Sequence, residues 1–80
     1  MKARIHITLK DGVLDPQGKA IHNSLEGLGF DGVNGVRQGK FIEIELDGDD
    51  AAAAKAKVSA MCEQLLANMV IEDYSVKIDG

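Results

Sequence analysis

Apolar and polar residues alternate over the first ten positions of the chain. Ala3, Ile5, Ile7 and Leu9 occupy every second position from residue 2 to residue 10, and charged or polar side chains separate them. A period of two is typical of a strand with one buried face. The same alternation returns in residues 40–47 and again in residues 70–78. The pattern therefore predicts a strand in each of these three segments.

Two further segments have the period of an α-helix. Asp15 places an N-cap acceptor directly before a proline at the first helical position, which predicts a helix from residue 16. Its inward stripe would be Ile21, Leu25 and Leu28, with Gly29 as the C-cap. A second helix should follow the acidic turn at residues 47–50. Its core face is expected to comprise Ala54, Val58, Met61, Cys62, Leu65 and Met69.

The glycine-rich segment from residue 30 to residue 39 predicts a short strand around Val33 and Val36. With this strand the element order is β-α-β-β-α-β, and the chain is expected to form one domain over residues 1–80. The expected class is α+β, in the ferredoxin-like layout of an antiparallel sheet with two helices on one face. The weak strand specifies its register loosely, so exchange of elements between two copies is a further expectation.

In this layout the first and third strands are neighbours. Lys2, Arg4 and His6 would then lie beside Glu43 and Glu45 on the face without helices, where opposite charges can pair.

Size and composition narrow the source of stability and the kinds of partner. A chain of 80 residues gains little from a single core, and one cysteine excludes an intrachain disulfide, so self-association is expected. The net charge of −4 disfavours nucleic acid as a partner. An apolar run of about 20 residues, as a membrane span needs, is absent from the sequence. A cytoplasmic protein without membrane or nucleic-acid partners is expected.

Several short patterns have structural explanations that outweigh chemical ones. Residues 27–32 match G-x-G-x-x-G, but they follow a helix instead of leading into one, which disfavours a dinucleotide site. The acidic turn lacks the pattern of a calcium loop. His6, His22 and Cys62 have no neighbouring group in the sequence that would make them a metal site or a catalytic pair. The sequence therefore predicts no catalytic, metal or cofactor residues in this chain.

Four stretches together resemble one known family. They are Val13–Gly18 at the start of the first helix, Leu28–Phe30, Val36–Lys40, and Val70–Tyr74. In this order and in a chain of this length they are similar to the PurS family, the small subunit of phosphoribosylformylglycinamidine synthase. One departure is Met69 after Asn68, where family members often have proline.

The resemblance implies a subunit of an ATP-dependent, glutamine-hydrolysing ligase of purine biosynthesis. Such a complex converts formylglycinamide ribonucleotide, glutamine and ATP to formylglycinamidine ribonucleotide. A glutaminase subunit would release ammonia, and a large synthetase subunit would bind ATP and magnesium. This chain would be a dimeric or tetrameric adaptor that binds no cofactor and joins the other two. The alternative is a free-standing dimeric regulatory domain that binds a small metabolite.

The resemblance also suggests which residues contact the larger subunits. The candidates for docking are Asp15, Pro16, Gln17, Gly18, Arg37 and Lys40. A structural role is the alternative to docking both at the start of the helix and at the turn. Asp15 and Pro16 are suited to capping a helix, Gly18 to close packing, and Arg37 and Lys40 to a solvated turn.

Overall fold

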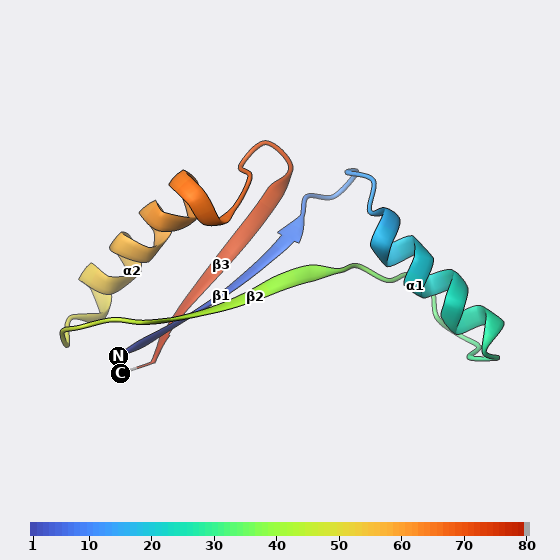
Figure 1. Ribbon diagram of the computed structural model, residues 1–80, viewed down its shortest axis with the longest axis horizontal. Helices are drawn as coiled ribbons and strands as arrows, with labels where there is room; N and C mark the ends of the chain where they lie inside the picture. Colours follow the sequence, from blue (N-terminus) through green and yellow to red (C-terminus); the bar gives the residue numbers. More distant parts are fainter. Residues whose placement is uncertain (80) are drawn as a thin grey trace.

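Three antiparallel strands form the centre of the molecule, which a computed structural model describes for residues 1–79 (Figure 1). Strand β1 (Lys2–Leu9) lies between β2 (Gly39–Glu45) and β3 (Glu72–Asp79). Ile5 is opposite Ile42 on one side and Val76 on the other. The α+β class, the antiparallel sheet and the three strands predicted from alternation are confirmed, although β3 begins two residues later than expected.

The apolar face of β1 is the core of the sheet. Ala3, Ile5 and Ile7 are completely buried there. Helix α2 (Ala51–Met61) packs over β1 and β3 on this face and buries Val58. As predicted, an acidic residue caps the N-terminus of the helix. The Asp50 side chain accepts a hydrogen bond of 3.1 Å from the Ala53 N–H.

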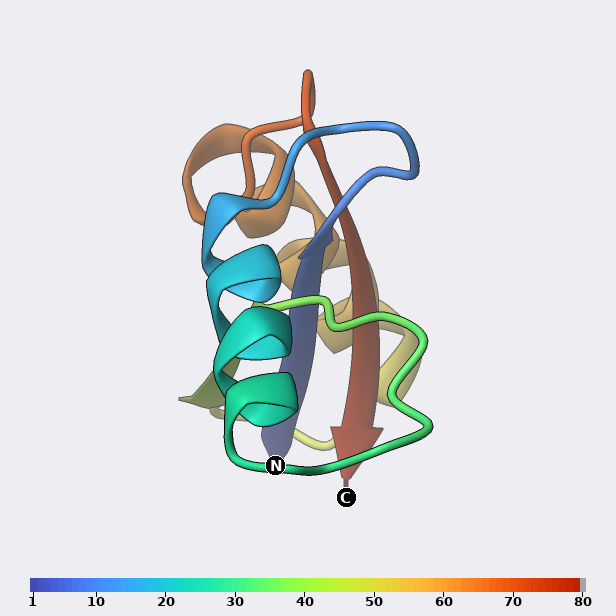
Figure 2. The same cartoon turned by 90° about the vertical axis from the view of Figure 1, so that its right-hand side faces the viewer.

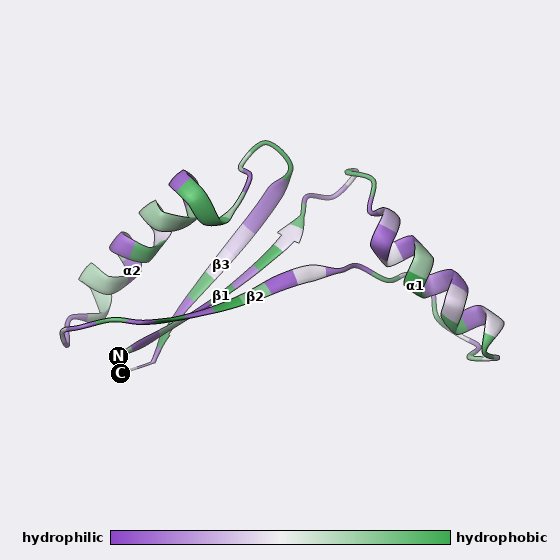
Figure 3. Ribbon diagram, in the orientation of Figure 1, coloured by the Kyte–Doolittle hydropathy of each residue, from purple (hydrophilic) through white to green (hydrophobic). Residues whose placement is uncertain are grey.

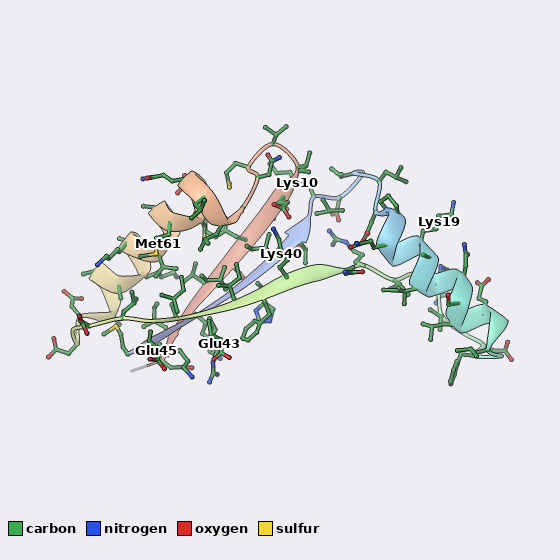
Figure 4. All side chains as sticks on the ribbon, in the orientation of Figure 1. Lys10, Lys19, Lys40, Glu43, Glu45 and Met61 are labelled. Atoms are coloured by element: carbon green, nitrogen blue, oxygen red, sulfur yellow. The ribbon has the colours of Figure 1, made fainter. Side chains whose placement is uncertain are left out.

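The opposite face of the sheet is charged. Glu43 and Glu45 lie on the side away from α2 (Figure 4). Lys2 Nζ is 3.3 Å from Glu43 Oε2, and Arg4 Nη1 is 3.0 Å from Asp79 Oδ2. The predicted pairing of opposite charges between neighbouring strands is confirmed. These pairs are exposed, and such pairs contribute about 0–1 kcal/mol each.

The end of the second helix differs from the prediction. After Met61 the chain forms one π-helical turn, η1 (Cys62–Leu66), in which the Ala67 N–H donates to the Cys62 carbonyl over 2.9 Å. The wider turn brings Leu66 and Ala67 toward the core cluster. The expectation that Leu65 and Met69 belong to the core was therefore wrong. Leu65 is 82% exposed, and Met69 lies beyond the helix.

Helix α1 (Pro16–Gly27) projects beyond the end of the sheet (Figure 1), and Figure 2, viewed from this end, shows α1 in front with the sheet behind it. Within residues 1–79, α2 is the helix that packs on the sheet, so the expected position of both helices on one face is not reached within this chain. Residues 31–38 run back beside α1 as an irregular segment and are not part of a strand, unlike the expectation for residues 30–39. We call residues 16–38 the arm, residues 31–38 the return segment, and the sheet with α2 and η1 the sheet body.

The arm gives the molecule an extended shape and a large surface. The radius of gyration is 15.9 Å and the extents are 48 × 25 × 15 Å. A compact domain of this length has a radius of gyration of roughly 12 Å. The accessible surface is 5684 Å², and a folded monomer of this mass exposes roughly 4,700 Å². The excess is about 1,000 Å², which is close to what each partner contributes to a standard protein interface.

The core assignment can be tested with two truncations. Ile5→Ala removes a completely buried side chain and should lower the free energy of unfolding by roughly 2–5 kcal/mol. Leu65→Ala removes an exposed side chain and should change it by no more than about 0.5 kcal/mol. Urea unfolding monitored by circular dichroism measures both values. Equal losses would contradict the placement of the core beneath α2.

Candidate functional site

The six candidate docking residues gather where the arm joins the sheet body. They come from the loop after β1, the first turn of α1, the end of the return segment and the start of β2. A shallow notch at this junction is lined by Ile7, Leu9, Asp15, Gln17, Gln38, Gly39, Lys40 and Glu72. The side chains of Pro16 and Gln17 face solvent. Residues far apart in the sequence thus meet at a single place, which we call the arm root.

Asp15 connects two segments at the arm root. Its Oδ1 accepts a hydrogen bond from the Gly18 N–H, and its Oδ2 accepts one from the Gln38 N–H, each over 2.9 Å. The first bond is the predicted helix cap, and the second ties the helix to the return segment. The hydrogen bond from Gln38, followed by that from Gly18, holds the pKa of Asp15 below its ordinary value because both stabilise the charged carboxylate.

Two glycines permit close backbone contacts at this junction. A Cβ atom on Gly18 would lie 2.5 Å from the Val36 carbonyl oxygen and 2.6 Å from Asp15 Oδ2. A Cβ atom on Gly39 would lie 2.4 Å from the Ile7 carbonyl oxygen. Neither position has room for a side chain, so α1, the return segment and β1 approach closely only because these residues are glycine.

The two basic candidates make contacts within the chain. The Arg37 guanidinium donates to the Leu9 carbonyl through Nη2 and lies 3.4 Å from Asp11 Oδ1 through Nη1. Lys40 Nζ lies 3.6 Å from Glu72 Oε2, and both Lys40 and Lys10 are close to the junction (Figure 4). The Arg37 and Lys40 side chains are still about half exposed. The sequence analysis missed Asp11, Gln38 and Glu72, because only the folded chain brings them to this point.

A second feature is apolar surface that the chain leaves uncovered. On the arm, Ile21, Leu28 and Phe30 are exposed. On the sheet body, Ile42 and Ile44 of β2 are only half-buried, since α2 packs over β1 and β3. Figure 3 shows hydrophobic positions on both α1 and β2. One apolar surface on the arm and another on the sheet body are thus available for a partner.

The described residues provide little for bond-making chemistry. Cys62 is completely buried, and this burial raises the pKa of its thiol, which disfavours the nucleophilic thiolate. The His6 ring lies against Phe41, with ring centroids 4.7 Å apart. His22 Nε2 is 2.9 Å from the Val33 carbonyl oxygen. Over residues 1–79, His, Cys, Asp and Glu side chains form no group of three that could hold a metal ion.

The glycine pattern at residues 27–32 marks the end of a helix. Helix α1 stops at Gly27, and Gly29 follows with a φ of +92°, a left-handed conformation that favours glycine. The pattern leads away from the helix, as the sequence predicted, so it does not place backbone N–H groups around a phosphate. No helix of residues 1–79 is both long and apolar enough to cross a membrane.

This chain is similar in sequence and in fold to known PurS proteins. The family profile described as PurS, phosphoribosylformylglycinamidine (FGAM) synthase, matches residues 2–80. The phosphoribosylformylglycinamidine synthase subunit PurS of Synechocystis is 51% identical over 75 residues, which cover 94% of this chain and 75% of that protein.

Solved structures of the same group also match. The crystal structure of Methanocaldococcus jannaschii PurS has a TM-score of 0.89 at 42% identity and covers 98% of this chain and 94% of its own. A chain in the structure of PurLQS from Thermotoga maritima has a TM-score of 0.86 at 35% identity, with coverage of 95% and 93%.

The close contact at Gly18 can be tested against a matched glycine in the same helix. Gly27→Ala should raise the free energy of unfolding by roughly 0.5–1 kcal/mol, because its Cβ meets nothing within 4 Å and alanine favours helix. Gly18→Ala should lower it, since the added methyl group would overlap the Val36 carbonyl and the Asp15 side chain. Chemical denaturation measures the free energy of unfolding of both variants. Stabilisation by both would show that the return segment is not held against α1.

Proposed function

This chain belongs to the PurS family and is a PurS subunit of phosphoribosylformylglycinamidine synthase, an enzyme of purine biosynthesis, and we propose that it is the complex's non-catalytic adaptor. In this proposal a glutaminase subunit releases ammonia from glutamine. A synthetase subunit binds ATP and magnesium and uses that ammonia to convert formylglycinamide ribonucleotide. The complex, a glutamine-hydrolysing ligase, works in the cytoplasm. The adaptor binds no cofactor and contributes positioning, which shortens the time in which ammonia can escape to water.

The observation that carries the adaptor role is the surface left open in the isolated chain. The accessible surface of this chain is about 1,000 Å² larger than that of a compact monomer of the same mass, and apolar side chains of the arm and of β2 contribute to it. A protein whose chemistry lies elsewhere and whose apolar surfaces need partners is suited to assembly. Membership in a family of enzyme subunits replaces the alternative of a free-standing metabolite-binding domain.

The first partner in this proposal is a second copy of the chain. The sheet order β2-β1-β3 makes β2 an edge strand, and α2 leaves the apolar side of β2 only half-buried. An arm from a second copy has complementary parts, since its return segment is not paired with a strand of its own sheet and its helix carries an apolar stripe. That return segment would pair with the outer edge of β2, and that helix would cover Ile42 and Ile44.

Such an exchange completes the ferredoxin-like layout with elements from two chains. The return segment of one copy supplies the strand that the sheet of the other lacks, and α1 supplies the second helix on its apolar face. Because each copy gives an arm and receives one, the contact is symmetric and closes as a dimer. Pairs of such dimers would form the tetramer that the sequence analysis also allows.

The second kind of partner is the larger subunits. Gln17, Arg37 and Lys40 present half-exposed or exposed polar groups at the arm root, next to Asp15, Pro16 and Gly18. We keep this set as the proposed docking site. Asp15 and Gly18 would act through the backbone that they hold in place, while Gln17 and Lys40 would contact a partner directly.

Self-association through the arms predicts a specific effect of one substitution on α1. Ile21→Glu places a charge on the apolar stripe that should lie against β2 of the second copy, and it should raise the dimer dissociation constant by at least tenfold. Lys19→Glu on the same helix introduces the same side chain at an exposed position that already carries charge, and it should have little effect. Sedimentation equilibrium measures both. Unchanged association of Ile21→Glu would contradict the exchange.

The adaptor role predicts that glutamine-dependent activity requires this chain. The glutaminase and synthetase subunits alone should show little ATP-dependent synthesis from glutamine, and adding this chain should restore it, while the isolated chain should be inactive. The measurement is product formation with purified subunits, with ammonium chloride as an alternative nitrogen source. Full glutamine-dependent activity without this chain would refute the adaptor role.

Two variants of this chain extend the same assay to the docking site. Lys40→Gln should weaken assembly because it removes a half-exposed charge at the arm root. Lys55→Gln removes an exposed charge from α2 and serves as the control. Equal assembly with both variants would remove Lys40 from the docking site.

A further inference from the structure

The arm is joined to the sheet body by two chain crossings. One is the loop from Lys10 to Asp15 after β1, and the other is the link from Arg37 to Gly39 before β2. Three polar contacts bridge these crossings. Arg37 donates to the Leu9 carbonyl and pairs with Asp11, and the Gln38 N–H donates to Asp15. We call these contacts the latch.

The latch contacts depend on the direction of the arm. Gly39 is held against the Ile7 carbonyl and pairs with Thr8 across the β1–β2 ladder, so the start of β2 is fixed. The return segment continues outward from this point in the direction of β2 (Figure 1). To lie against its own sheet, the return segment would have to reverse at Gln38 and run back along β2. Such a reversal would turn the Gln38 N–H away from Asp15 and carry Arg37 away from Leu9.

Two directions of the arm therefore compete for the same apolar surface. With the arm turned back, α1 and the return segment would cover β2 of their own chain. With the arm outward, they are free to cover β2 of a second copy. Both directions bury similar groups, so the contacts present in only one of them decide between the two.

We propose that Asp15 and Arg37 are positioning residues that hold the arm outward, so that it reaches a second copy instead of closing on its own sheet. This inference rests on the self-association proposed above and identifies the groups that direct it. The latch consists of hydrogen bonds and an ion pair between charged side chains and the opposite crossing. It acts on the arm's direction and leaves the helix and the sheet themselves unchanged.

The two oxygens of Asp15 allow the latch to be separated from the helix cap. Asp15→Asn keeps one acceptor oxygen and asparagine is as good an N-cap as aspartate, so the bond to Gly18 can persist. The second oxygen becomes an NH₂ group, which cannot accept from the Gln38 N–H. Arg37→Gln removes the charge that faces Asp11. Asp31→Asn removes an exposed arm carboxylate outside the latch and is the matched control.

The experiment measures the arm's direction within one chain. Asn23→Cys on α1 and Asp49→Cys near the far end of β2 provide two exposed sites for spin labels, and the native Cys62 is fully buried. A trace of doubly labelled chain is mixed with an excess of the same variant without labels. Double electron–electron resonance then reports the distance between the labels of one chain, whatever its oligomeric state.

With the latch intact, and in Asp31→Asn, a single long distance is expected. The double variant Asp15→Asn, Arg37→Gln should add a shorter distance, with the ratio of turned-back to outward chains about tenfold higher, as expected for the loss of bonds to charged groups. Each single variant should give a smaller shift in the same direction. Identical distance distributions in the latch variants and the control would overturn the proposal, as would a short distance already dominant with the latch intact.

The same samples separate this proposal from the one on which it rests. Sedimentation at the concentrations used for the distance measurement shows whether the unmodified chain associates. A monomer with an outward arm would contradict the proposed exchange but support the latch. A dimer whose arm direction is insensitive to Asp15→Asn and Arg37→Gln would support the exchange and overturn the latch.

Discussion

The partial coverage of the sheet by α2 is the constraint on which the rest of this structure depends. The helix packs over β1 and β3, and the completely buried side chains of β1 lie beneath it. Strand β2 receives no helix from its own chain, and its apolar residues stay half-buried. In a chain of 80 residues, a substantial part of the apolar surface that could form the core is therefore not fully buried. In the proposed exchange, the outward arm of a second copy makes up this deficit.

The two faces of the sheet divide the work that an assembly subunit needs. The face toward α2 supplies apolar area, which drives association without regard to direction. The other face carries cross-strand ion pairs among Lys2, Arg4, Glu43 and Asp79, which keep it solvated. Polar contacts at the arm root add direction. In the proposed adaptor role, the apolar area and the defined geometry would together position the two active sites.

The sequence predicted the local elements well and their arrangement less well. Alternation gave β1 and β2 nearly to the residue, and Asp15-Pro16 gave the start of α1, because these signals are set by neighbours in the chain. The helical period of apolar residues did not predict the π turn after Met61. This turn shifts the following side chains by one position around the helix axis, and Leu65 becomes exposed as a result. The strand expected at residues 30–39 did not form because the outward arm keeps residues 31–38 away from the free edge of β2. The candidate docking residues meet at the arm root through contacts over more than 20 positions, which no local pattern predicts, and their docking role stays a proposal.

Asp15 shows why the fold of this chain and its assembly are difficult to separate. Its carboxylate caps α1, a local task that the sequence alone reveals, and it also accepts from the Gln38 N–H, the contact that we propose favours the outward direction of the arm. Gly18 must leave room for both, because a side chain there would meet the Asp15 carboxylate and the Val36 carbonyl together. Asp15 and Gly18 therefore belong both to the start of α1 and to the proposed docking site. Since the arm carries the apolar stripe, whatever fixes its direction also fixes where that stripe can be buried, and a capping residue becomes a determinant of assembly.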